Sequence, residues 1–101
     1  MPRHDPVTAS LYRAVLLRDK GCILAKIQAD HVCRDRWGYP HAPTDLAKLT
    51  IEHVHDGYGL MGRRAPSDMA HCLALCFGAN VGVPSKAQRA MMRAYLRAVE
   101  G

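Results

Sequence analysis

The sequence lacks any apolar run long enough to cross a membrane. A membrane-spanning helix needs about 20 mostly apolar residues, and every apolar stretch of this chain is interrupted sooner. The opening residues, Met-Pro-Arg-His-Asp, also lack the apolar segment of a secretory signal peptide. We therefore expect a cytoplasmic protein that has no contact with a membrane.

Internal repeats and low-complexity tracts are missing as well, and 101 residues are too few for two domains. We expect one domain over residues 1–101, with a flexible arm at residues 1–7. Apolar residues make up 49% of the chain, which argues against disorder. A domain of this size buries a thin core and often needs a metal or a partner. We expect a monomer or a homodimer.

Acidic residues are scarcer than basic ones. The chain has 9 Asp and Glu against 14 Lys and Arg, which gives a formal charge of +5. A basic surface suits phosphate-bearing partners, because each neutralised phosphate releases counterions. Many small soluble proteins are basic, so charge alone does not select nucleic acid as the partner.

Caps, chain breakers and apolar spacing together predict an α+β fold. Thr8 or Ser10 is expected to cap the first helix, and Ser85 the last one. The apolar stretch Cys22–Ile27 is expected to form an irregular strand. The other expected elements are a helix to about Asp19, a helical turn at 45–48, strands at 49–54 and 72–76, a knuckle or short helix at 77–80, and a helix over about 85–99.

The last helix carries two side-chain patterns. One is an apolar stripe at helical spacing, which we expect to face the core or a dimer partner. The other is a basic row on a different face of the helix. The stripe consists of Ala87, Ala90, Met91, Ala94, Tyr95 and Ala98, and the row of Lys86, Arg89, Arg93 and Arg97.

The centre of the chain combines short polar residues in a way that suits hydrolysis. Glu52 and His53 end the first strand, and Asn80 follows the second. A hairpin followed by a helical turn can bring such side chains to one point, where oxygen and nitrogen ligands hold a divalent metal. A neutral imidazole can accept a proton from water near pH 7. The pattern predicts a hydrolytic metal site.

Four motifs occur here in a set order. Arg18-Asp19-Lys20-Gly21-Cys22 comes first, and Glu52-His53-Val54 ends the first strand. His71-Cys72-Leu73-Ala74-Leu75-Cys76 forms the second strand, and Asn80 lies nine residues after His71. In this order the sequence resembles the HNH endonucleases over roughly residues 10–97, as a small phage or prophage type, with His71 in place of the usual Asn. The resemblance implies a ββα-metal (His-Me finger) core at about 49–82 with flanking N- and C-terminal helices.

The resemblance also implies a role for each matched residue. Glu52 and Asn80 would be the metal ligands, and His53 the general base in a DNA-nicking reaction. His71 would either orient His53 or join the metal shell. Mg²⁺ or Mn²⁺ suits the first case, and Ni²⁺ or Zn²⁺ the second. DNA-binding residues would be Arg63, Arg64, Arg89, Arg93 and Arg97, with His55 in a secondary role.

A structural zinc site is the least regular part of the resemblance. Many relatives carry two Cys-x-x-Cys pairs, but Ala25 and Ala79 stand here at the two second positions. Cys33, with His31 or His41, could restore the ligands. The candidate ligands are therefore Cys22, Cys33 and Cys76. Alternatively, all four cysteines, including Cys72, are small buried apolar residues.

Other interpretations remain open. The chain could be a nucleic-acid-binding domain without catalytic activity on the same scaffold. It could also be an interaction module that contacts phage packaging or assembly proteins, and a phage origin would place it in the host cytoplasm. His53 and His71 could be ordinary structural histidines, and Asn80 could serve a left-handed turn. Trp37 and Tyr39 are expected to anchor their loop.

Overall fold

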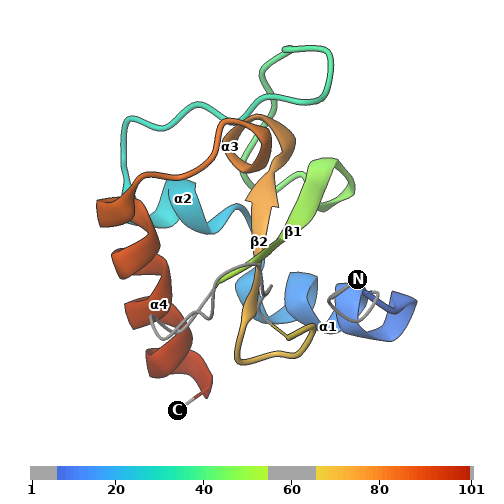
Figure 1. The fold of residues 1–101 in the computed structure, drawn as a ribbon. Helices are drawn as coiled ribbons and strands as arrows, with labels where there is room; N and C mark the ends of the chain where they lie inside the picture. The colour runs from blue at the N-terminus through green and yellow to red at the C-terminus, as the bar shows by residue number, and fades with distance from the viewer. Residues whose placement is uncertain (1–6, 55–65, 101) are drawn as a thin grey trace, which may run out of the picture.

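Two short antiparallel strands lie at the centre of the fold (Figure 1). The computed structural model describes residues 7–54 and 66–100. Strand β1, Leu49–His53, pairs with β2, Cys72–Cys76, so that Leu49 lies opposite Cys76 and His53 opposite Cys72. Every residue of β2 is buried, because helices from both halves of the chain pack against it. The helical elements are α1 (Ala9–Asp19), α2 (Ile23–Ile27), the 3-10 turn η1 (Leu46–Lys48), α3 (Phe77–Val81) and α4 (Lys86–Glu100).

The α+β class and most of the expected elements are confirmed. Thr8 caps α1, since its Oγ1 accepts a hydrogen bond from the Leu11 N–H at 3.1 Å. Ser85 and Gln88 form a reciprocal capping box at the start of α4. Helix α3 follows β2 directly, so the hairpin and this helix give a ββα-like order (Figure 1). In the part of the chain that the structure describes, no helix has the length and apolar character needed to cross a membrane.

The expected strand at Cys22–Ile27 is wrong, because Ile23–Ile27 is helix α2. Ile23 and Leu24 are adjacent and both buried, whereas Lys26 is exposed. A strand would turn one of two adjacent residues away from the core. The helix lets both apolar side chains reach it.

Of the two alternatives for the apolar stripe of α4, the core-facing one is wrong for every member except Tyr95. Met92 and Leu96 are the buried residues of this helix, and Tyr95 packs against the core beside them. Burying a Met or Leu side chain contributes about 1.5–3 kcal/mol, far more than an alanine methyl does. Bulk therefore decides which of two helically spaced sets turns inward. The exposed members of the expected stripe are Ala87, Ala90, Met91, Ala94 and Ala98.

A buried charged network joins α1 to β2 and α4. Asp19 is fully buried and accepts hydrogen bonds from the Ala74 N–H at 2.8 Å and the Tyr95 hydroxyl at 2.5 Å. Arg18 pairs with Asp19 and donates to the carbonyl oxygens of Met69 and Cys72. The Arg18-Asp19 motif therefore fixes the first helix to the second strand.

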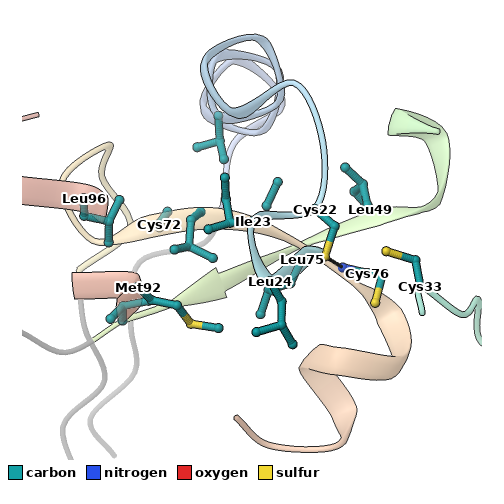
Figure 2. Close-up of a cluster of buried hydrophobic side chains, with 14 residues drawn as sticks. Cys22, Ile23, Leu24, Cys33, Leu49, Cys72, Leu75, Cys76, Met92 and Leu96 are labelled. Carbon is teal, nitrogen blue, oxygen red and sulfur yellow. Dashed lines mark hydrogen bonds between the residues drawn. The ribbon is translucent and has the colours of Figure 1, made fainter. Parts of the chain in front are cut away.

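The core has a sulfur-rich end and an aliphatic end. Figure 2 shows the sulfur atoms of Cys22, Cys33 and Cys76 together at one end of β2, whereas Met92 and Leu96 lie toward the other end. These three cysteines are fully buried or nearly so. The sulfur-rich end adjoins the junction between β2 and α3.

The loop between α2 and η1 is not anchored by its aromatic residues, contrary to expectation. Trp37 and Tyr39 are 73% and 69% exposed. The loop is fixed through its backbone, because the Asp35 carboxylate accepts hydrogen bonds from the N–H groups of both residues. A loop whose turn is held by such hydrogen bonds keeps its shape without an apolar contact from its aromatic side chains.

Candidate active site and metal centre

Glu52 and His53 are the last two residues of β1, and both border the same small cavity. Glu52 lies near Arg89 of α4. The His53 Nε2 atom lies 2.9 Å from the Ser67 hydroxyl oxygen, in the turn before β2. Arg89 and Arg93 join Glu52 and His53 around a cavity of about 20 Å³, room for a water molecule.

The environment of Glu52 is mixed. Partial burial raises the pKa of this carboxyl above its usual value, whereas the positive charge of Arg89 and the N–H of His53 act in the opposite direction. The Glu52 carboxylate can bind a metal ion, and the Arg89 guanidinium can then bind a phosphate in place of the carboxylate.

Asn80 reaches the same side of β1 from helix α3. Its Nδ2 atom donates to the Thr50 hydroxyl at 2.9 Å and to the Ile51 carbonyl at 3.2 Å. Thr50 and Glu52 share one face of the strand, since they are two residues apart. A carbonyl oxygen can only accept, so the amide nitrogen must face Ile51. The amide oxygen of Asn80, which is a ligand type that hard divalent cations prefer, is used in neither contact.

Among the described residues, the hydrogen-bond partner of the His71 ring is Asp68 and not His53. The His71 Nδ1 atom lies 2.8 Å from the Asp68 carboxylate, and the His71 backbone carbonyl accepts from the Val54 N–H at 2.7 Å. The imidazole of His53 is bonded to Ser67 instead. Ser67 and Asp68 bond the two histidines, and no motif of the sequence predicted these contacts.

The predicted DNA-binding residues fall into two groups. Arg63 and Arg64, with His55, lie outside the described residues. Arg89 and Arg93 are half-buried and face the cavity near Glu52, and Arg97 is exposed on the same helix. Arg89 also donates to the Pro84 carbonyl at 3.1 Å, which fixes its direction.

A second cluster gathers four metal-binding side chains from three segments. Cys22 precedes α2, His31 and Cys33 lie in the loop that follows, and Cys76 ends β2. Their ligand atoms all lie within 4.8 Å of one another, an arrangement that can hold a metal ion such as Zn²⁺. The expected set of Cys22, Cys33 and Cys76 is thus brought together, and His31 is the histidine that accompanies it.

The remaining candidates are excluded from this cluster. Cys72 is buried elsewhere, and its Sγ atom contacts the Pro66 carbonyl at 3.7 Å. The Nδ1 atom of His41 lies 2.8 Å from the Ala42 carbonyl, and its Nε2 atom is buried without a hydrogen-bond partner among the described residues. Cys72 therefore matches the interpretation of a small buried apolar residue.

The thiols of the cluster are electrostatically linked. The pKa of Cys76 is lowered, chiefly because the Cys22 thiol hydrogen-bonds to its sulfur, and that of Cys22 is raised by the same contact. Burial raises the pKa of Cys33 to about 11. A cation that replaced the thiol protons would remove this competition, since metals bind the deprotonated form.

Comparisons with protein-family models, curated proteins and solved structures give no match for this chain.

Proposed function

We propose that this protein is a metal-dependent DNA endonuclease of the ββα-metal type, which hydrolyses phosphodiester bonds and nicks DNA. One observation carries the proposal. Glu52 of β1 and Asn80 of α3 lie on the same side of an antiparallel hairpin, where Asn80 bonds Thr50, two residues from Glu52. Arg89 and Arg93 of α4 lie beside Glu52.

The donor atoms suit a hard divalent cation. The Glu52 carboxylate and the Asn80 amide oxygen are the ligand types that Mg²⁺ and Mn²⁺ prefer. Because His71 bonds Asp68, the oxygen-based set is favoured over a histidine-rich one for Ni²⁺ or Zn²⁺. When bound, the ion would supply positive charge at the scissile phosphate and leaving oxygen.

His53 is the proposed general base. A water molecule loses its proton to the imidazole as its oxygen forms a bond to phosphorus, and the phosphorus–oxygen bond in line with it breaks. The Ser67 hydroxyl holds the ring of His53 in place at 2.9 Å. Ser67 thus takes the orienting role that the resemblance gave to His71.

The arginines of α4 supply the substrate contacts in this proposal. Arg89 and Arg93 flank the cavity, and Arg97 extends the same helix outward. Guanidinium groups bind phosphate oxygens with paired hydrogen bonds. The Cys/His cluster takes no part in the chemistry, because four protein ligands close a tetrahedral shell and leave no open position.

The test is nicking of supercoiled plasmid DNA with Mg²⁺, Mn²⁺, Ni²⁺ or Zn²⁺ added separately, and with a chelator as the blank. His53→Ala should lower the rate by about 10²–10⁴-fold, the usual contribution of a general base. His41→Ala, a histidine substitution in the loop after α2, is the matched control and should retain activity.

Full activity in His53→Ala would refute the mechanism. Salt-sensitive DNA binding without cleavage under any metal would favour a non-catalytic nucleic-acid-binding domain. Failure to bind DNA even at low salt would favour a protein-interaction module, such as one that contacts phage packaging proteins.

A further inference from the structure

We infer that Cys22, His31, Cys33 and Cys76 form a structural zinc site with a Cys₃His ligand set. The site is separate from the proposed nuclease centre, and its test does not depend on the outcome of the test for nuclease activity.

The spacing of the ligand atoms fits zinc. Zn–S bonds of about 2.3 Å and Zn–N bonds of about 2.0 Å give a tetrahedron with edges of about 3.5–3.8 Å. The four atoms lie within 4.8 Å of one another, and His31 Nε2 is 3.3 Å from Cys76 Sγ. Small side-chain rotations would close the remaining gap, so no backbone rearrangement is required.

A disulfide explains the cluster less well than a metal does. All four cysteines are free thiols in the structure. A disulfide between any two of Cys22, Cys33 and Cys76 would not explain why the third thiol and the His31 ring lie against the same point. A tetrahedral ion uses all four groups.

The surroundings favour negatively charged sulfur. The Cys76 N–H donates to Cys22 Sγ at 3.3 Å, and the Ala79 N–H donates to Cys76 Sγ at 3.4 Å. Amide donors aimed at sulfur stabilise the thiolate, which is the form that binds a metal. They would also disperse the single negative charge left when three thiolates and one histidine hold Zn²⁺.

The ligand set differs from two Cys-x-x-Cys pairs. Ala25 and Ala79, at the two second positions, are half-buried and pack against the core. His31 and Cys33 come instead from the loop between α2 and η1. The site therefore ties this loop to the junction of β2 and α3, where the Gly78 N–H also donates to the Arg34 carbonyl at 3.0 Å.

The test measures metal content of the full-length protein by elemental analysis, together with the visible spectrum after replacement by Co²⁺. We expect one zinc per chain and the intense absorption of a tetrahedral cobalt–thiolate centre. Cys33→Ser and His31→Ala should each weaken the affinity for zinc by about 10-fold to 100-fold. Cys72→Ser, which removes a buried thiol outside the cluster, should leave zinc content unchanged.

Ligand substitutions could prevent folding, so zinc titration of the metal-free wild-type protein is the second measurement. An increase in melting temperature at one equivalent of Zn²⁺ supports the site. Wild-type protein that binds neither Zn²⁺ nor Co²⁺ overturns it. Equal zinc loss in Cys72→Ser and Cys33→Ser also overturns it. Zinc content without any nicking activity would support this site and count against the nuclease alone.

Discussion

At the scale of single residues, polar side chains hold positions that the apolar pattern of the sequence could not reveal. Asp19 was visible as part of a motif, but its burial was not. It is the only charged residue fully buried among the described ones. It persists there because a backbone N–H, a phenol and a guanidinium satisfy its oxygens. Ala74 and Tyr95 are distant from Asp19 in the sequence, so no local pattern predicts these hydrogen bonds.

Tyr95 offers a test of this network with a defined pH dependence. The pKa of Tyr95 is raised to about 12, mainly by burial and to a smaller extent by the hydrogen bond to Asp19. Tyr95→Phe should lower the free energy of unfolding by about 1 kcal/mol near neutral pH. The neutral phenol stabilises the fold fully below its unfolded pKa of about 10, and this stabilisation is lost as the pH rises to about 12.

Urea denaturation of both proteins at several pH values measures this difference. The gap in stability between wild type and Tyr95→Phe should narrow between pH 10 and pH 12, the window set by the raised pKa. Tyr39→Phe is the control, because Tyr39 is 69% exposed. A gap that stays constant across that window would show that the Asp19 contact does not stabilise the fold.

At the scale of elements, the sequence predicted where the helices and strands lie along the chain better than which of their side chains face the core. Strand β2 lies where the apolar run placed it, since a buried strand is continuous in sequence. Helix α4 was also placed correctly, but its inward face was not. Two sets of residues on this helix have helical spacing, and only packing against β2 and α2 decides between them. The same applies to α2, whose five residues are too few for a period to be read.

Met91 and Met92 provide a matched pair for the orientation of α4. Met92→Ala should lower the free energy of unfolding by about 2–5 kcal/mol, because it empties a buried site. Met91→Ala should cost less than about 1 kcal/mol, since Met91 is 41% exposed. Chemical denaturation of the two variants tests the prediction. Equal losses would mean that the inward face of α4 has been misassigned.

The proposed substrate contacts of α4 are tested by the salt dependence of DNA binding. Arg97→Ala should weaken binding about equally for all DNA sequences, and should reduce the slope of log K against log salt by roughly 1. Arg13→Ala is the control, because Arg13 is an exposed arginine on α1. Identical slopes for wild type and Arg97→Ala would remove Arg97 from the DNA contacts.

At the scale of the whole molecule, the candidate sites depend on how separate segments meet. The motif order predicts that Glu52, His53 and Asn80 lie near one another, because they flank one hairpin. It did not reveal that Ser67 contacts His53 or that His31 joins the thiols, since each contact joins a residue outside the strands to the end of a strand. The cysteine positions in the sequence predicted three of the four members of the Cys/His cluster and left the histidine undecided. Tertiary packing selects His31.

Hydrogen exchange tests the proposed zinc site through its effect on the fold. After zinc removal, the N–H groups of His41 and Gly78 should exchange faster, because their acceptors lie in the loop that the ion would fix. The N–H of Tyr12 in α1 should keep its protection. Uniform loss of protection along the chain would indicate global unfolding. Unchanged protection at His41 and Gly78 would contradict the proposal that the ion fixes this loop.

The network around Asp19 also bears on how the chain is made. Asp19 lies near the start of the chain, and Tyr95, which donates to it, follows 76 residues later. During synthesis from the N-terminus, helix α1 emerges with a carboxylate that cannot enter an apolar core until its partners exist. We expect this domain to reach its native core only when α4 has left the ribosome, and nascent chains lacking α4 to remain open to proteases and chaperones.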